Sequence, residues 1–374
     1  MDRERYPRTS FGQGRRTPGR HGYVAYFPTP IPRGLTFPMS TLAMLGDAEA
    51  FLGRLAGMNR RLPSPSPLLR PFVLREALAS SRIEGTRATI SEVIEADAAG
   101  QVPNADVEEV LSYVDALEWG LSQLTRLPIS ARLVSGMHKR LMAGERGRGH
   151  TPGDLRTTQN WIGPPGSTIE TAEFVPPPPK ELPAALSDWE HFSNERSTMP
   201  VLIQAALMHS QFQTIHPFLD GNGRIGRLML VYFLIAQGRL DAPLLYLSDY
   251  LEADRRRYDA SLAAIQQRGD PVPWVELFLA AVRTQAGDAL TRATTILALR
   301  DRYLEEVVGM GTAKAIDAVD LICQSPVLTA RLMEQRLGVS RPTALRLSRR
   351  LEKRGVLREQ ARGTRGSGIT WQRR

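Results

Sequence analysis

The stretch HPFLDGNGRIGR, residues 216–227, decides the fold of this chain. Within it, residues 221–226 read G-N-G-R-I-G, which matches the glycine fingerprint of dinucleotide-binding folds. That fingerprint requires a preceding β-strand in a βαβ unit, but the apolar residues 200–215 predict a helix. A Walker loop is also excluded, because no Lys-Ser or Lys-Thr pair follows the glycines. We therefore expect a phosphate site of another kind, with helices on both sides.

The glycine turn offers donors for an anion. Gly221, Asn222 and Gly223 can turn their N–H groups inward as a nest. A helix expected to begin near Arg224 adds its positive N-terminal end. Arg224 and Arg227 are three residues apart, so both can reach phosphate oxygens from one helix face.

A base and a metal ligand precede the turn. Asp220 supplies a hard oxygen suited to Mg²⁺, and His216 can act as a general base near neutral pH. Taken singly, a histidine before proline is most often a cap, and Asp-Gly-Asn-Gly is most often a turn. Together, in this order, these residues favour attack on a nucleotide phosphate.

The composition limits the classes of protein to consider. The chain has 374 residues, 42% of them hydrophobic, which suits two or three globular domains. Its single cysteine, Cys323, excludes an internal disulfide and a cysteine-based zinc site. Residues 1–20 do not form a secretory signal, and the longest apolar run, residues 228–236, is well short of the ~20 residues of a membrane span. We therefore expect a cytoplasmic protein.

The positive charge is concentrated at one end. Residues 326–374 hold thirteen Lys and Arg against three Asp and Glu, a net charge of +10, while the whole chain carries +9. The remaining residues therefore sum to −1. This asymmetry is typical of a nucleic-acid-binding end attached to a nearly neutral body.

Hydrophobic periodicity predicts a mainly α protein. Helices are expected at residues 40–62 with Ser40 as N-cap, then at 68–85, 88–97, 106–124, 130–143, 200–215, from about 224, within 251–309, and at 329–337 and 341–354. Residues 1–35 are expected to form a loose arm, and the four prolines at 176–179 exclude helix there.

Residues 216–227 resemble the motif of the Fic family, HPFx(D/E)GNGRxxR, at every specified position. The segments at 151–163, 174–179 and 243–252 are also similar to bacterial Fic proteins, so the resemblance covers about residues 35–285. It implies transfer of AMP from Mg-ATP to a Ser, Thr or Tyr hydroxyl of a target protein or of the enzyme itself. The implied roles are His216 as base, Asp220 as Mg²⁺ ligand, and Gly221, Asn222, Gly223, Arg224, Gly226, Arg227 and Tyr258 at the nucleotide.

Two further segments gain meaning from this resemblance. SSRIEG, residues 80–85, resembles the family's inhibitory motif through Ser80, Glu84 and Gly85. Its glutamate would pair with Arg227 and occupy the seat of the γ-phosphate. Residues 171–176 resemble the family's flap, an exposed β-hairpin on which a target lies as an added strand. The target-docking residues would be Glu173, Phe174 and Val175, and a plain proline-rich surface loop is the alternative.

Residues 314–374 resemble a winged helix. Arg341, Arg346, Arg349 and Arg350 would line its second helix, and Arg362 and Arg365 its wing, in contact with DNA. A dimerisation or docking module is the alternative, and a homodimer is one option for the oligomeric state.

The expected fold is a helical Fic core with a short β-hairpin flap, followed by a winged helix-turn-helix. The expected parts are an arm at 1–35, an N-terminal helical region at 36–125, the Fic core at 126–285, a helical linker at 286–313 and the winged helix at 314–374. Two alternative functions remain: a transcription regulator whose Fic domain only senses nucleotide, and a Fic enzyme that removes AMP or transfers phosphocholine or phosphate. The intact His216 favours an enzyme.

Overall fold

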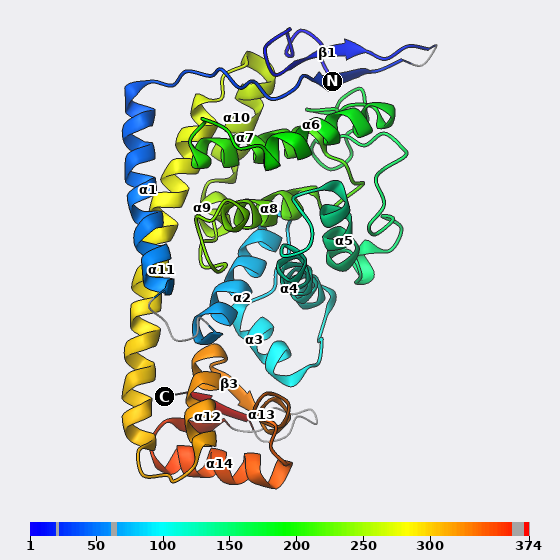
Figure 1. Cartoon of the computed structure of the whole chain (residues 1–374). Helices are drawn as coiled ribbons and strands as arrows, with labels where there is room; N and C mark the ends of the chain where they lie inside the picture. Colours follow the sequence, from blue (N-terminus) through cyan, green and yellow to red (C-terminus); the bar gives the residue numbers. More distant parts are fainter. Residues whose placement is uncertain (20–21, 61–65, 361–369, 374) are drawn as a thin grey trace.

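The computed structural model describes residues 1–19, 22–60, 66–360 and 370–373. It is mainly helical, as the sequence predicts (Figure 1). The body contains α1 (Met39–Arg60), α2 (Ser66–Ile83), α3 (Ile90–Ala99), α4 (Ala105–Gln123), α5 (Ala131–Leu141), α6 (Leu182–Asn194), α7 (Val201–Ile215), α8 (Asn222–Ala236), α9 (Ser248–Ala253), α10 (Arg255–Arg268) and α11 (Val272–Val307), with short 3₁₀ turns at Glu145–Gly147 and Pro179–Glu181. Among the described helices, none combines the length and apolarity that crossing a bilayer requires.

Helices α7 and α8 form the centre of the body. Residues 202–215 of α7 are all buried, and so is most of α8. Helices that are apolar on every face belong in a core, because any exposed face would leave apolar surface in water. α2, α4, α5 and α6 surround the pair. The connection between α7 and α8 carries the sequence motif, so the most buried elements of the protein position it.

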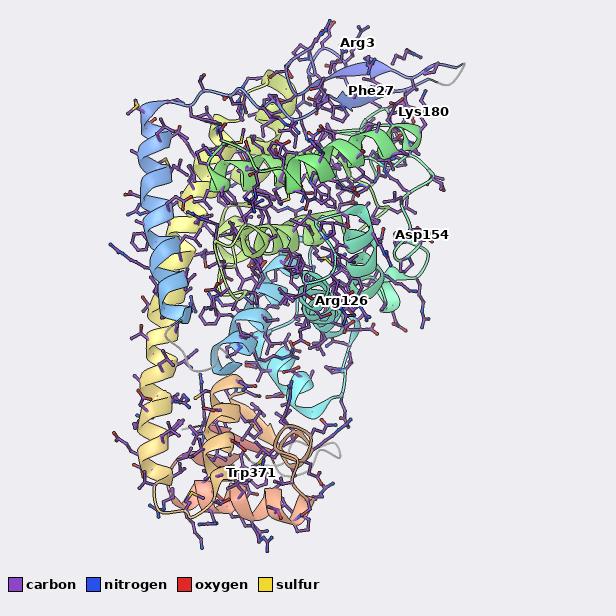
Figure 2. All side chains as sticks on the ribbon, in the orientation of Figure 1. Arg3, Phe27, Arg126, Asp154, Lys180 and Trp371 are labelled. Atoms are coloured by element: carbon purple, nitrogen blue, oxygen red, sulfur yellow. The ribbon has the colours of Figure 1, made fainter. Side chains whose placement is uncertain are left out.

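The N-terminal residues form a hairpin, which differs from the expected loose arm. β1 (Gly12–Arg16) pairs antiparallel with β2 (Val24–Pro28). Met1, Tyr6 and Tyr26 are buried in a small core with Phe174 and Val175. Apolar and aromatic side chains thus pack the N-terminal residues against a distant segment. The proline and arginine content of these residues had instead suggested a loose arm. Figure 2 places Arg3 and Phe27 at this end of the molecule.

Two expected boundaries also change. α1 begins at Met39, so Ser40 lies in its first turn instead of capping it. The boundary expected at residue 285 falls inside α11, a continuous helix of 36 residues that reaches the C-terminal part of the chain (Figure 1).

The C-terminal unit has its own core and sheet. It contains α12 (Ala313–Gln324), β3 (Val327–Thr329), α13 (Ala330–Leu337), α14 (Arg341–Lys353), β4 (Leu357–Gln360) and β5 (Thr370–Arg373). The strands are antiparallel in the order β3-β5-β4. Trp371 and Met333 lie in its buried cluster. Figure 2 shows Trp371 at the opposite end of the molecule from the hairpin. α12 packs against α2, and α13 and β3 pack against α3.

Candidate active site

The motif turns sharply between two buried helices. His216 caps α7 in the left-handed conformation (φ 49°, ψ 61°), and Gly221, the residue before α8, has φ 79°. A left-handed residue other than glycine is strained and is kept only where its surroundings enforce it. α8 starts at Asn222, two residues before the expected position. The first-turn N–H groups of α8 have no acceptor within their own helix, so this end suits an anion.

The imidazole of His216 is held as a neutral base. Its Nδ1 lies 3.1 Å from the carbonyl oxygen of Gln213, to which it donates, so Nε2 carries the free lone pair. Burial lowers the pKa of His216 to about 4, against the opposing effect of the Gln213 hydrogen bond. The ring is therefore uncharged at neutral pH and ready to accept a proton.

Arg156 and Asn160 hold the backbone at His216. The Arg156 Nε donates to the carbonyl of His216 at 2.8 Å, and Asn160 donates to the carbonyl of Phe218 at 2.8 Å. Arg156 is buried and also donates to the carbonyl of Pro177; burial lowers its pKa to about 10. These two residues account for the left-handed histidine. Both lie in residues 151–163, a segment that the family resemblance covers but to which no role was assigned.

His138 supports the turn from α5, although no motif or spacing in the sequence indicated this role. Its ring stacks on Phe218 with centroids 3.8 Å apart. Gly153 N–H donates to its Nδ1 at 2.9 Å, so Nε2 carries the proton and donates to the carbonyl of Asp220 at 3.0 Å. Burial lowers the pKa of His138 to about 4, which keeps this tautomer neutral.

Asn222 acts through its side chain on the loop itself. Its amide accepts from the N–H of Phe218 and donates to the carbonyl of the same residue, both at 2.9 Å. The side chain is buried, so only the backbone N–H of Asn222 remains for an anion. The sequence motif predicts Asn222 at the turn, and only the structure separates the side-chain contacts of Asn222 from its backbone N–H.

Asp220 presents the exposed carboxylate of the motif. One oxygen accepts the N–H of Gly221 at 2.6 Å, and the other faces Arg224 at 3.6 Å. In the described residues there is no cluster of three or more His, Cys, Asp or Glu that would hold a metal by itself. A single carboxylate suits Mg²⁺ that is bound mainly through waters and phosphates.

Glu84 lies where an anion would bind. Its Oε1 accepts from Arg227 at 2.8 Å, and Arg227 also donates to the hydroxyl and carbonyl of Ser80, each at 2.9 Å. A methyl group added to Gly223 would stand 2.2 Å from the same Glu84 oxygen, so the carboxylate rests directly on the glycine turn. Although burial opposes ionisation, the ion pair with Arg227 outweighs it and lowers the pKa of Glu84. Gly85 follows at φ 100°, which suits the residue that ends α2.

Two candidate nucleotide residues belong to the core instead. Tyr258 is buried, and its hydroxyl lies 2.7 Å from His209 Nε2, so it has no face to offer to adenine. A side chain on Gly226 would meet Gln213 at 2.2 Å, so this glycine allows α8 to approach α7 closely. The sequence pattern of a helix does not show which of its faces will be buried, so these two roles could not be excluded from the sequence.

Two of the three expected docking residues of the flap are buried, and Glu173 is exposed. The described chain shows a single bridge, Ile162 with Phe174, where a β-hairpin was expected. The outer edge of Glu173 and Val175 is occupied, because their carbonyls accept from the Tyr6 hydroxyl and the Tyr26 N–H. Phe174 and Val175 are buried, so this edge cannot receive a target strand.

Most of the candidate DNA-binding arginines lie on one helix. Arg341, Arg346 and Arg349 are exposed on α14. Arg350 donates to the carbonyl of Met310 and so helps to hold α14 in place. The candidate wing residues Arg362 and Arg365 lie outside the described residues.

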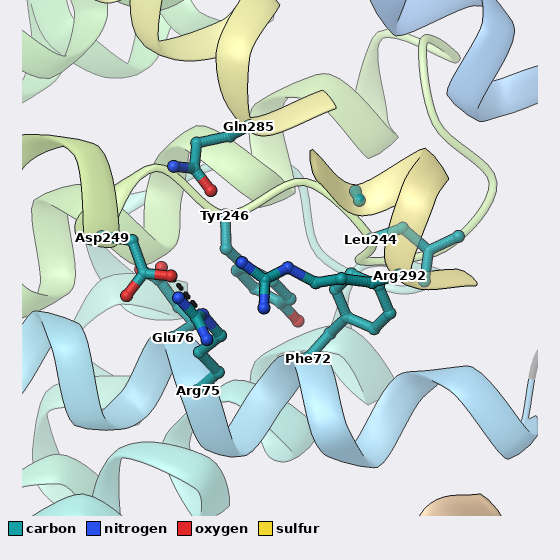
Figure 3. A pocket seen from close by; sticks show the side chains of 9 residues that line it. Phe72, Arg75, Glu76, Leu244, Tyr246, Asp249, Gln285 and Arg292 are labelled. Atoms are coloured by element: carbon teal, nitrogen blue, oxygen red, sulfur yellow. Dashed lines mark hydrogen bonds and ion pairs between the residues drawn. The ribbon is translucent and has the colours of Figure 1, made fainter. Parts of the chain in front are cut away.

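A separate pocket lies on α2, two turns before Glu84 (Figure 3). It is lined by Arg75, Glu76, Tyr246 and Asp249, with an ion pair between Arg75 and Asp249. The buried Glu76 carboxylate accepts from the N–H of Ser248 at 3.1 Å, and burial raises its pKa to about 7. None of the motif residues lines this pocket, so we assign it to the packing of α2.

Two regions of this chain match the Fic/DOC family. Residues 42–122 match the N-terminal region of the Fic/DOC family, and residues 128–234 match the Fic/DOC family itself. The chain belongs to the Fic/DOC family. The second match includes the complete Fic motif between α7 and α8.

Curated relatives align over part of their length. A probable protein adenylyltransferase of Aquifex aeolicus is 30% identical over 96 residues, which is 26% of this chain and 30% of the relative. The protein adenylyltransferase Fic of Nematostella vectensis is 29% identical over 241 residues, 61% of this chain and 51% of the relative. The alignments thus span about half of the relatives' length or less.

Solved structures share the fold. A Fic family protein from Desulfovibrio desulfuricans has a TM-score of 0.58 at 20% identity and covers 92% of this chain and 98% of its own. Residues 134–508 of Fic-1 from C. elegans give a TM-score of 0.52 at 21% identity, covering 68% of this chain and 75% of that one. At these identities the likeness concerns the Fic fold alone.

Proposed function

We propose that this protein is an adenylyltransferase that moves AMP from ATP to a Ser, Thr or Tyr hydroxyl of a target protein or of itself. The observation that carries this proposal is His216, a neutral imidazole with a free Nε2 in the turn that leads into the N-terminus of α8. The curated relatives, which are named as protein adenylyltransferases, support it.

We propose the following roles for these groups in the reaction. Nε2 of His216 accepts the proton of the incoming hydroxyl, whose oxygen attacks the α-phosphorus of ATP. A bond forms between that oxygen and phosphorus, the bond to pyrophosphate breaks, and AMP remains on the target. The N–H groups of Asn222 and Gly223 and the forks of Arg224 and Arg227 stabilise the negative charge. Mg²⁺ at Asp220, when bound, would neutralise phosphate charge.

Glu84 would act as an internal brake on this reaction. Its carboxylate pairs with the Arg227 guanidinium and lies against Gly223. The phosphates of ATP and the Glu84 carboxylate would therefore compete for the same position. ATP could then bind only in a pose unsuited to in-line transfer.

We propose a position for the target segment that differs from the one expected from the sequence. Since the hairpin occupies the edge of Glu173 and Val175, we propose that the target lies along Trp161 and Ile162, on the other side of the bridge. Both side chains are partly exposed, at 44% and 39%, and the neighbouring Asn160 contacts the catalytic loop.

The test uses Mg-ATP labelled at the α-phosphate, with the full-length protein alone and with cell extract. Glu84→Gly should raise incorporation of the label severalfold or more, because it frees Arg227 and the glycine turn. His216→Ala in the Glu84→Gly background should abolish incorporation. Equal activity of the wild type and the Glu84→Gly variant would exclude the brake, and label transfer without His216 would exclude the proposed base.

A second candidate function is DNA binding by the C-terminal unit. The exposed arginines of α14 and the net charge of +10 over residues 326–374 favour it. The helix–turn–helix pair α13 and α14 is compatible with docking of α14 in a major groove.

A further inference from the structure

The residues that follow Glu84 are hydrogen-bonded to side chains of α4. Thr86 is buried, and its hydroxyl donates to Glu109 Oε2 at 2.7 Å. The N–H of Arg87 donates to Asp106 Oδ2 at 3.1 Å. The brake therefore does not depend only on the ion pair of Glu84, because the chain two residues later has its own buried anchor.

The same carboxylate of Glu109 reaches into the nucleotide site. Its other oxygen, Oε1, accepts from Arg224, and both side chains are almost completely buried, at 6% and 5% exposure. Arg146 pairs with Oε2 of Glu109 and with Asp106. Two arginines thus neutralise Glu109, which explains how a buried carboxylate is tolerated here.

Arg224 is buried, and one of its guanidinium donors is unsatisfied among the described residues. Glu109 fixes one of its terminal nitrogens, while Nε is buried and has no hydrogen-bond partner within the described part of the chain. The second terminal nitrogen donates to Met142 Sδ at 3.6 Å and faces the Asp220 carboxylate at 3.6 Å. A buried donor without an acceptor is costly in a folded protein, and a phosphate oxygen would satisfy it.

We propose that Glu109 is a positioning residue that joins the brake to the nucleotide site. One oxygen orients Arg224 toward phosphate, and the other holds Thr86 and so keeps Glu84 seated on Arg227. This inference rests on the proposed function, since it assigns Arg224 to the triphosphate. The Thr86 hydroxyl is the part of this link that can be removed without disturbing the motif.

The first test removes that hydroxyl in the full-length protein. Thr86→Val has nearly the same shape as threonine but cannot donate to Glu109, whereas Thr86→Ser keeps the donor. We expect Thr86→Val to raise the rate of self-labelling from α-labelled ATP severalfold, toward that of Glu84→Gly, and Thr86→Ser to behave as wild type. In the Glu84→Gly background Thr86→Val should add nothing. A wild-type rate for Thr86→Val, or full additivity with Glu84→Gly, would overturn the link.

The second test concerns the orientation of Arg224. Glu109→Gln in the Glu84→Gly background should raise the KM for ATP about tenfold while kcat changes less, because the ground-state grip on phosphate is weakened. An unchanged KM would overturn the positioning role. A purely structural defect would instead lower the melting temperature and the active fraction without moving the KM.

A third measurement separates this inference from the proposed function. If neither wild type nor Glu84→Gly transfers any label, the proposed activity fails, but amide hydrogen exchange still reports on the anchor. Exchange at residues 84–87 should be faster in Thr86→Val than in Thr86→Ser. Equal exchange in the two variants would overturn the anchor itself.

Discussion

A single histidine in this protein acquires its chemistry from its surroundings. The hydrogen bond to Gln213 selects the tautomer of His216, and burial keeps the ring neutral. Arg156 and Asn160 donate to its backbone carbonyl and so fix the backbone. The imidazole ring takes no part in these hydrogen bonds, so it can accept a proton.

The pH dependence of the reaction should reveal this environment. Since burial lowers the pKa of His216 to about 4, the base stays unprotonated as the pH falls through the range of an ordinary histidine. We expect kcat/KM for ATP of the Glu84→Gly variant to remain level from about pH 8 to about pH 5.5 and to fall only at lower pH. An acid limb centred near the ordinary histidine value of about 6.5 would show that the ring is not shielded in the free enzyme.

At the level of elements, the N-terminal hairpin supports the flap. Tyr26 packs against Phe174 with ring centroids 5.6 Å apart, and its N–H donates to the carbonyl of Val175. The hairpin thus replaces the second strand that the flap lacks, and it leaves Trp161 and Ile162 on the open side.

Loss of one hairpin side chain should loosen the flap. Tyr26→Ala removes a ring from the small core around Phe174, so chymotrypsin should cleave after Phe174 at least about tenfold faster. Fragment masses from limited digestion measure this rate. Arg16→Ala, an exposed change on the same hairpin, is the control. Equal cleavage rates for Tyr26→Ala and Arg16→Ala would contradict the supporting role.

On the scale of the whole molecule, α11 connects two cores. Its first half packs beside α1 and the body, and its end enters the buried cluster of the C-terminal unit through Tyr303 and Val307. The C-terminal unit in turn contacts α2, the helix that leads to Glu84. The basic unit and the candidate active site are therefore parts of one packed structure.

The charge of the C-terminal unit leads to a salt-dependent prediction. We expect the full-length protein to retard mixed-sequence duplex DNA at about 50 mM salt and much less at about 200 mM, because binding releases counterions. The double variant Arg346→Ala, Arg349→Ala should bind more weakly and with a shallower salt dependence. Arg126→Ala, which removes an exposed charge from the body (Figure 2), should bind as wild type. If the folded protein causes no retardation at low salt, the C-terminal unit does not bind DNA.

Helical periodicity and the run HPFLDGNGRIGR predicted the helical class and the position of the motif, because one stretch of chain contains each of these patterns completely. The pairing of Glu84 with Arg227 joins distant residues, and it was implied by the family resemblance. Only the tertiary structure showed that Tyr258 and Gly226 belong to the core, that the hairpin covers Phe174 and Val175, and that Glu109 holds Arg224. Burial and contacts between residues far apart in the chain arise from packing, and no local pattern encodes which face of a helix or edge of a strand will be covered.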